Sequence, residues 1–294
     1  MPNIKSILVT GANGQLGQSI NSIAPEYPEY QFHFVTRNQL DLSDIENITT
    51  YFQKNNFDLI INCAAYTAVD KAEQEAELAD AINHQAVKKL AEIAKEQSTV
   101  LIHISTDYVF DGTSYKPYVE TNQVNPQSNY GASKLKGERA LQIISPEGCI
   151  IRTSWVYSEF ANNFVKTMIK LGQQRDQLSV IFDQIGSPTY AKDLAQAIMK
   201  IVANNGLIKH TKLPIYNFSN EGVCSWYDFA KAIFEMNNIN CNVSPIETKD
   251  YPTPAKRPHY SLLNKAKIKL DYDLIIPYWK DSLKSCLKAL QERK

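Results

Sequence analysis

A glycine-rich turn directly after the first apolar segment constrains the fold of this 294-residue chain more than any other feature. Residues 5–10 form a β-branched apolar run that predicts a strand, and residues 15–23 predict a helix. Glycine allows a tight turn and lets the backbone approach a pyrophosphate, while a helix N-terminus offers free N–H groups. The turn therefore predicts a dinucleotide site. Residues 11–17 spell G-x-x-G-x-x-G. The candidate binding residues among them are Gly11, Asn13, Gly14, Gln15, Leu16 and Gly17.

Strands and helices then alternate through the first 150 residues or so. Further strands are predicted at residues 32–35, 58–63, 99–105 and 148–155, and further helices at 45–54, 79–97 and 129–144. The third and fourth strands are apolar on both faces, which is typical of parallel strands covered by helices. This order predicts an α/β fold with a doubly wound, Rossmann-type parallel sheet. Asp70 and Glu73 have the spacing of a capping box, which predicts a helix start there.

After residue 155 the alternation loosens, and prolines gather at positions 245, 252, 254 and 258. We therefore expect a smaller α/β substrate-binding domain. The dinucleotide-binding domain is predicted at 1–152 with a return segment at about 177–203, and the smaller domain at 153–176 and 204–294.

Composition excludes several classes of protein. The 31 basic and 31 acidic side chains balance, whereas general nucleic-acid binding needs a basic surface. No apolar run approaches the ~20 residues of a membrane helix, and the N-terminus lacks a signal-peptide core, so a cytoplasmic protein without membrane partners is expected. The five cysteines are scattered without metal-ligand spacing, which predicts reduced thiols. His103 lies inside an apolar run and is predicted to be a satisfied core residue.

The end of the second strand indicates which dinucleotide is bound. NAD sites usually have an acidic residue there for the ribose 2′-OH, whereas this chain has Thr36 and Arg37. Arg37 could pair with the 2′-phosphate of NADP, and a solvated surface arginine is the alternative. The prediction is NADPH, with NADH as an alternative cofactor. The residues expected along the adenine and under the cofactor are Asp41, Leu42, Cys63, Ala64 and Ala65.

A candidate catalytic set follows the fourth strand. Tyr130 and Lys134 form Y-x-x-x-K in a predicted helix, so both side chains share one face. A nearby ammonium moves the pKa of a phenol toward neutral pH, which suits acid–base catalysis. Thr106 comes directly after the strand, where its hydroxyl can donate to a carbonyl oxygen. The alternatives are a solvated Tyr–Lys pair and a threonine that caps the strand end.

Together these motifs resemble the extended short-chain dehydrogenases, and longer stretches resemble the dTDP-4-dehydrorhamnose reductase family. The stretches are NCAAYTAVDKAE at 62–73, STDYVFDG at 105–112, RTSWVY at 152–157, QIGSPT at 184–189 and KRP at 256–258. The resemblance covers almost the whole chain. It implies reduction of the 4-keto group of a nucleotide-activated sugar by NADPH, in which Tyr130 protonates the alkoxide, Lys134 tunes Tyr130 and Thr106 holds the oxygen.

The resemblance also implies which residues face the substrate. They are Thr67, Val69, Thr106, Asp107, Tyr108, Trp155 and Arg257. Trp155 would form an apolar wall and Arg257 would meet the diphosphate, against the alternatives of a core aromatic and a surface arginine. Some members of the family hold a divalent metal at a dimer interface. The matching positions here are Ser19 and Lys192, neither of which supplies a carboxylate. No metal is expected, and the chain is expected to be a monomer or a weak homodimer.

Several related functions stay open at this point. Nucleotide-sugar dehydratases usually have an acidic residue after Thr-Asp, and Tyr108 in that place disfavours dehydration. Another nucleotide-sugar 4-ketoreductase or a 4-epimerase would use the same Tyr–Lys pair. A non-catalytic NADP-binding regulatory subunit has the same fold. The exact sugar and nucleotide base are not determined by these residues.

Overall fold

The computed structural model describes residues 4–204 and 212–293. Six parallel strands form the central sheet in the order β10-β5-β4-β3-β1-β2. They are β1 (Ser6–Thr10), β2 (Gln31–Val35), β3 (Leu59–Asn62), β4 (Val100–Thr106), β5 (Gly148–Thr153) and β10 (Ile215–Phe218). The strand order reverses between β1 and β3, which is where doubly wound sheets bind ligands. The predicted Rossmann-type α/β fold is confirmed.

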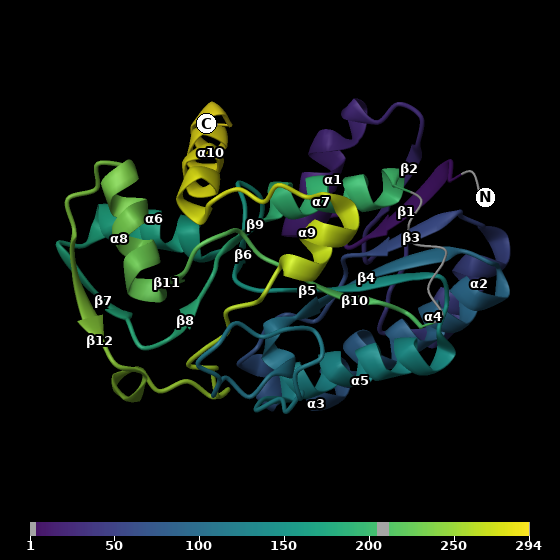
Figure 1. Cartoon of the computed structure of the whole chain (residues 1–294), viewed down its shortest axis with the longest axis horizontal. Coiled ribbons are helices and arrows are strands. Elements are labelled where there is room, and N and C mark those ends of the chain that lie inside the picture. Colours follow the sequence, from purple (N-terminus) through teal and green to yellow (C-terminus); the bar gives the residue numbers. More distant parts are fainter. Residues whose placement is uncertain (1–3, 205–211, 294) are drawn as a thin grey trace.

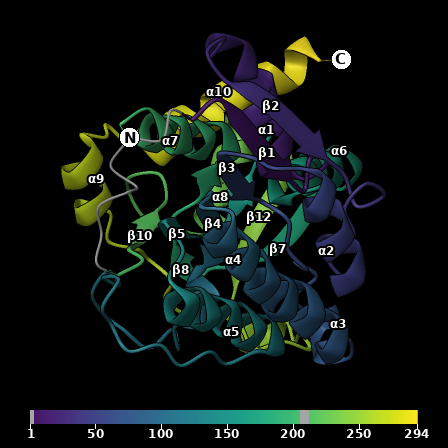
Figure 2. The ribbon, with the colours of Figure 1, turned by 90° about the vertical axis from the view of Figure 1, so that its right-hand side faces the viewer.

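Helices cover both faces of this sheet (Figure 1). One face carries α1 (Gln15–Ile23), α7 (Ala191–Ala203) and α9 (Ala266–Tyr272), and the other carries α2 (Ile45–Lys54), α4 (Ala86–Glu96) and α5 (Asn129–Ile144). Figure 2 shows the strands between these two layers. Because both faces are covered, every residue of β3 is buried, as its continuous apolar run predicts.

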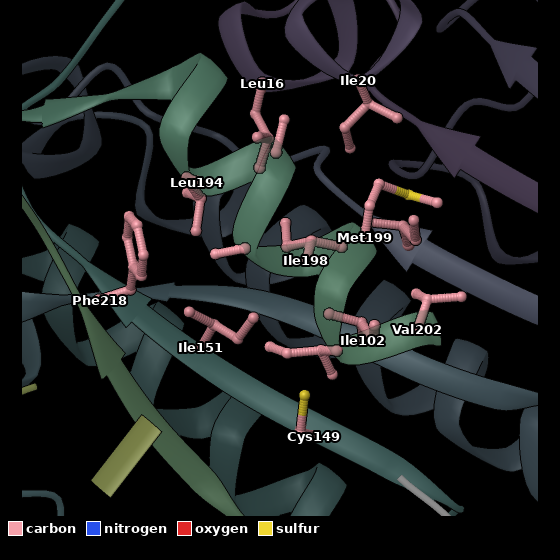
Figure 3. Close-up of a cluster of buried hydrophobic side chains, with 14 of the residues drawn as sticks. Leu16, Ile20, Ile102, Cys149, Ile151, Leu194, Ile198, Met199, Val202 and Phe218 are labelled. Atoms are coloured by element: carbon pink, nitrogen blue, oxygen red, sulfur yellow. The ribbon is translucent and has the colours of Figure 1, made fainter. Parts of the chain in front are cut away.

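The core between α1, α7 and the sheet is drawn in Figure 3. Leu16 and Ile20 of α1 face Leu194 and Ile198 of α7, and both pairs are at most 7% exposed. This contact fixes α1 on its face of the sheet. It thereby also fixes the glycine turn, which joins the carboxyl end of β1 to α1. The apolar side chains of α1 recur at helical spacing, so burying them orients its N-terminus toward the carboxyl ends of the strands.

A smaller lobe lies beside the large sheet, on the left in Figure 1. It contains β6 (Val156–Tyr157), α6 (Phe164–Gln174), β7 (Gln177–Ile181), β8 (Ile185–Gly186), β9 (Thr189–Tyr190), β11 (Cys224–Ser225), α8 (Trp226–Met236), β12 (Asn242–Ile246) and α10 (Trp279–Glu292). Its strands form three two-stranded pairs, β6 with β9, β7 with β12 and β8 with β11. Its core centres on Phe229 and Trp279, whose rings meet edge to face.

Two boundaries of the lobes differ from the division expected from the sequence. Within 204–294, β10 is the sixth strand of the large sheet and α9 packs on that sheet. Within 177–203, β7 pairs with β12 of the smaller lobe, so only α7 returns to the large sheet. The strand β10 pairs with β5, a contact between segments more than 60 residues apart in the sequence, which periodicity does not reveal.

The helix predicted at 79–97 is interrupted. The structure has α3 (Ala76–Asp80), a π-turn at η3 (Ala81–Gln85) and then α4. The π-turn carries Asn83, whose side-chain amide accepts from the N–H of Tyr66 and donates to its carbonyl, at 2.9 and 3.0 Å. These are bonds to a distant loop, and π-turns of this kind are frequent at functional sites.

The capping box predicted at Asp70 is wrong. Residues 71–73 form only the short 3₁₀ helix η2 (Lys71–Glu73). Asp70 occupies its N-cap position, but the side chain of Asp70 makes no capping hydrogen bond. Its carboxylate instead pairs with Arg257, from 187 residues further along the chain. Elsewhere in the described residues, 3₁₀ helices occur at η1 (Ala24–Glu26), η4 (Asp107–Val109) and η6 (Thr248–Asp250). By contrast, Asp44 does cap α2, because its carboxylate accepts from the N–H groups of Glu46 and Asn47.

Candidate active site

A cavity of about 840 Å³ lies at the carboxyl ends of β1 to β5 and extends to the smaller lobe. This volume is in the range of small-molecule and cofactor sites. The sequence candidates for cofactor, catalysis and substrate all line this cavity except Gly17 and Arg257. Segments of both lobes therefore meet around one space, although they lie far apart in the sequence.

The glycine turn has the shape that a phosphate-binding turn requires. Gly11 has φ +67°, and a Cβ there would lie 2.9 Å from the backbone of Ala64. Gly14 caps α1 without any side-chain hydrogen bond, so the first N–H groups of the helix have no side-chain partner. These groups and the positive end of the helix dipole fit a diphosphate. The residues present therefore fit a dinucleotide in this cavity.

Gly17 does not line the cavity, but it packs directly against the turn at Gly11 and Ala12. A Cβ on Gly17 would meet the Gly11 carbonyl oxygen and lie 2.9 Å from the Cα of Ala12. We therefore expect Gly17→Ala to push α1 away from the turn, to destabilise the protein by about 1–3 kcal/mol and to weaken NADPH binding about tenfold or more. Fluorescence titration and thermal unfolding measure both effects. Ser22→Ala, at an exposed position of the same helix, is the control and should change neither.

Arg37 follows β2 at the rim of the cavity. Its side chain is 67% exposed and makes two long contacts, with Nε 3.3 Å from the Asp41 carboxylate and Nη2 3.4 Å from the Ser43 hydroxyl. Burial would raise the pKa of Asp41, but hydrogen bonds from Ser43 and Arg37 outweigh it and hold that pKa below its usual range. An exposed guanidinium beside a glycine turn suits a second phosphate better than a bare ribose hydroxyl.

Thr106, Tyr130 and Lys134 meet at the inner end of the cavity. Ser128 caps α5 by accepting from the N–H of Gly131, and this places the first turn of the helix, with Tyr130, beside β4. Burial raises the pKa of Tyr130 well above its usual value, and a hydrogen bond with Thr106 opposes the shift. Tyr130 therefore stays protonated at neutral pH, as a proton donor must.

Lys134 is 1% exposed and is held by the strand behind it. Its ammonium contacts the carbonyl of Ile104 at 2.7 Å and His103 Nε2 at 3.2 Å. The ring of His103 is bonded in turn to Asn62, and Asn62 to Thr10. Burial lowers the pKa of Lys134 to about 8, although nearby Glu138 opposes the shift. The prediction that His103 is a buried, satisfied residue is confirmed, and its contact with Lys134 was not foreseen.

Asp107 lies next to Thr106 and is 3% exposed. Thr106 Oγ1 is 3.0 Å from Asp107 Oδ1, while Oδ2 is buried without a hydrogen-bond partner in the described residues. Burial raises the pKa of Asp107 to about 7, against hydrogen bonds from Thr106 and Ser261. A carboxyl in this state can be neutral at physiological pH.

The outer part of the cavity is bounded by Trp155 and Tyr108. Trp155 stacks on Trp226 with ring centroids 3.7 Å apart, and its φ of +48° is unusual for a bulky residue. The ring of Tyr108 meets that of Tyr130 edge to face at 5.4 Å. Arg257 lies outside the lining: it pairs with Asp70 at 2.7 Å, and it donates to the Tyr108 hydroxyl at 3.2 Å.

Residues 5–292 match the family described as RmlD substrate binding domain. The chain belongs to the RmlD family. A dTDP-4-dehydrorhamnose reductase of Aggregatibacter actinomycetemcomitans is 40% identical to it over 286 residues, which is 95% of this chain and 97% of that protein. A dTDP-4-dehydrorhamnose reductase structure from Clostridium acetobutylicum superposes with a TM-score of 0.92 at 40% identity, covering 97% of this chain and 99% of that one.

A second solved RmlD-family structure concerns the cofactor. It is a dTDP-4-dehydrorhamnose reductase from Bacillus anthracis in complex with NADP, with a TM-score of 0.91 and 39% identity. The superposition covers 97% of this chain and 99% of that chain. The RmlD fold and the family resemblance predicted from the sequence are both confirmed.

Gln15 and Ala161 of the RmlD-type site have roles that the sequence did not indicate. Gln15 was predicted to contact the cofactor, and it lines the cavity. However, its amide also donates to the Val156 carbonyl and accepts from Ser158 and Asn163, so it links the two lobes. Ala161, with φ +47°, contributes to the lining from the smaller lobe. No local signal marks the link made by Gln15 or the position of Ala161, because both depend on how the two lobes pack.

Within residues 4–204 and 212–293, no three His, Cys, Asp or Glu side chains gather as metal ligands would. No helix there combines the length and the apolar character that crossing a bilayer requires. All five cysteines are free thiols, and Cys149, Cys224 and Cys286 are buried.

Proposed function

We propose that this protein reduces the 4-keto group of dTDP-4-dehydro-L-rhamnose to give dTDP-L-rhamnose, the last step of dTDP-rhamnose biosynthesis, with NADPH as cofactor. The observation that carries the proposal is the single cavity lined by the glycine turn and by Thr106, Tyr130 and Lys134. The names of the relatives and the NADP complex of the Bacillus anthracis protein support the choice of substrate and cofactor.

The cofactor would be held by the turn at Gly11–Gly17, by Arg37 on its 2′-phosphate and by the Cys63–Ala65 backbone. Asp41 and Leu42 would lie along the adenine. Bound there, NADPH supplies a hydride to C4 of the keto sugar. The fit of this cofactor rests on the uncapped N-terminus of α1 and on the backbone cradle at Gly11, both of which accept an anion without a charged side chain.

Three side chains carry the acid chemistry in this proposal. Thr106 donates a hydrogen bond to the keto oxygen and so orients it. Tyr130 gives its proton to the alkoxide that forms there, and its raised pKa keeps that proton available at neutral pH. Lys134 lines the same cavity one helical turn from Tyr130, and in this proposal its positive charge stabilises the phenolate left behind. The carbonyl of Ile104 and the ring of His103 hold the ammonium in position.

The substrate would occupy the outer part of the cavity. Thr67 and Val69 lie on the loop that Asn83 anchors through Tyr66, and Tyr108 and Trp155 provide aromatic walls. In this structure Arg257 is engaged by Asp70, so its proposed contact with the substrate diphosphate requires the phosphate to replace that carboxylate. We also propose that the large lobe binds the cofactor and the smaller lobe the nucleotide sugar, in a cytoplasmic monomer or weak homodimer without membrane or nucleic-acid partners.

The test is to follow NADPH absorbance while adding dTDP-4-dehydrorhamnose made in situ by the upstream enzymes. Stoichiometric oxidation, absent when the sugar is omitted, is the expected result. A 4-epimerase would convert the sugar without net oxidation of NADPH. A regulatory subunit would bind NADPH tightly and leave both compounds unchanged. Either of these outcomes would overturn the proposal.

Arg37→Ala tests the cofactor preference. Because the Arg37 side chain is exposed, we expect NADPH affinity to fall about tenfold, as for loss of one charge-assisted hydrogen bond, with NADH affinity nearly unchanged. Fluorescence titration with both cofactors measures this. The control is Lys54→Ala, which removes an exposed cation at the end of α2 outside the cavity lining. An equal loss of affinity for NADPH and NADH would mean that Arg37 does not bind the 2′-phosphate.

A further inference from the structure

Asp107 is a buried carboxyl at the reacting end of the cavity, and the acid chemistry proposed above gives it no task. Its side chain is 3% exposed, and it lines the cavity beside Thr106 and Tyr130. Its Oδ1 contacts the hydroxyl of Thr106 at 3.0 Å, and the hydroxyl of Ser261 also acts on the carboxyl. The other oxygen, Oδ2, is buried and has no hydrogen-bond partner in the described residues.

The hydroxyl of Thr106 has a single proton, and three groups compete for its bonds. It accepts the N–H of Tyr108 at 3.3 Å, it contacts Asp107 Oδ1, and it is hydrogen-bonded to Tyr130. An ionised Asp107 can only accept, so it takes the Thr106 proton in a charge-assisted bond. That proton is then not available to a keto oxygen. A protonated Asp107 can donate to Thr106 over the same distance, and the Thr106 proton is released toward the cavity.

The unpartnered Oδ2 favours the protonated form. A buried carboxylate oxygen without donors keeps the full cost of desolvating its charge, whereas the oxygen of a neutral acid costs much less. Burial also raises the pKa of Asp107, to about 7. The ionisable groups nearest to it in the cavity wall are Tyr108, Tyr130 and Lys134, with Arg257 behind Tyr108, and the rest of the wall adds Arg37, Asp41, Cys63 and Tyr66.

We propose that Asp107 is a positioning residue which, in its protonated form, turns the Thr106 hydroxyl toward the keto oxygen of the substrate. Ionisation of Asp107 withdraws that hydrogen bond and slows the reduction. Asp107 exchanges no proton with the substrate, so Tyr130 remains the proton donor and the reaction balances as before. This inference rests on the proposed reductase function.

The sign of the pH dependence follows directly. The active form holds the proton, so kcat/KM falls as pH rises through the pKa of Asp107, about 7 in the free enzyme. In Asp107→Asn the amide N–H replaces the acid O–H as donor to Thr106 and does not titrate. Relative to wild type, the activity of Asp107→Asn should therefore rise about tenfold between pH 6 and pH 8, because one pH unit above the pKa leaves ~10% of the acid protonated. Titration of Lys134 affects both enzymes equally and cancels in this ratio.

A double-mutant cycle shows whether Asp107 acts through Thr106. In the Thr106→Val background, Asp107→Asn should no longer change the pH profile, because the hydroxyl that it orients is gone. Glu92→Gln is the matched control: it removes one carboxylate on the exposed side of α4 and should leave the profile unchanged. Thermal unfolding and NADPH titration establish that each variant is folded and binds cofactor.

A measurement without turnover completes the test. Infrared difference spectra of wild type minus Asp107→Asn at pH 6 should contain the C=O stretching band of a protonated carboxyl, and this band should vanish at pH 9. Absence of the band at pH 6 would overturn the inference. So would an Asp107→Asn enzyme whose activity is lowered by the same factor at every pH, which is the behaviour of a carboxylate that must be ionised. If wild type oxidises no NADPH with the keto sugar, the proposed function fails, and the infrared band alone decides the state of Asp107.

Discussion

Tyr130→Phe is expected to lower kcat by about 10²–10⁴-fold, the usual contribution of a positioned general acid. The variant removes one hydroxyl and leaves the ring, which packs edge to face against Tyr108 in the wall of the cavity. Folding and NADPH affinity should therefore change little. Because burial raises the pKa of Tyr130, its hydroxyl holds the proton at neutral pH, and phenylalanine has no such proton to give. Steady-state NADPH oxidation with the keto sugar measures the loss.

The control for this variant is Tyr51→Phe. Tyr51 lies on α2, where it packs against Phe52 and Phe57 outside the cavity lining, so loss of its hydroxyl should leave kcat unchanged. A Tyr130→Phe enzyme that binds NADPH and keeps nearly full kcat would remove Tyr130 from the acid role. The proton would then have to come from another group in the same wall, such as Asp107.

Arg152→Met is expected to have the largest effect on stability. Arg152 and Glu138 form a bidentate pair of 2.7 and 2.9 Å, with side-chain exposures of 3% and 1%. The variant leaves the carboxylate of Glu138 buried, with Ser105 as a remaining donor. Removing one partner of a buried pair typically costs about 3–5 kcal/mol, because the other charge stays uncompensated. Urea unfolding monitored by tryptophan fluorescence measures the free energy of unfolding.

The double variant Arg152→Met/Glu138→Leu separates this explanation from a simple packing defect. It removes both charges, so we expect it to regain a large part of the lost stability. Lys88→Met breaks an exposed pair with Glu92 and should cost no more than about 0.5 kcal/mol. If the double variant is as unstable as Arg152→Met, the uncompensated charge is not the cause. The packing of Arg152 over the ring of Phe110 would then account for the loss.

The glycine turn and the catalytic motif were predictable because each is local. In the turn, Gly11 and Gly14 lie between a strand and a helix, and these positions already indicate the backbone geometry. In the structure Gly11 has a positive φ and Gly14 is the N-cap of α1. In the motif, a spacing of four residues in a helix puts Tyr130 and Lys134 on one face, and both line the cavity. The continuous apolar runs indicated strands with both faces covered, which is the arrangement found.

Long-range pairs of polar groups were not predictable from spacing. The capping box expected at Asp70 does not form, because Arg257 competes for the same carboxylate across 187 residues. The helix expected at 79–97 is interrupted because Asn83 bonds a loop outside it. The lobe boundaries shifted for a similar reason, since β10 gains a ladder of backbone bonds only by pairing with the distant β5.

The sequence by itself determined the α/β fold and the residues around the dinucleotide turn and the Tyr–Lys pair, because these depend on local periodicity and on backbone freedom at glycine. It indicated the family through the resemblance of longer stretches such as 62–73 and 105–112. Only the tertiary structure decided the protonation states of those residues. The pKa of Asp107 and of Lys134 depends chiefly on burial, and both groups have partners from distant parts of the chain, Ser261 for Asp107 and His103 for Lys134. Desolvation is a property of the packed site, so no pattern along the chain reports it.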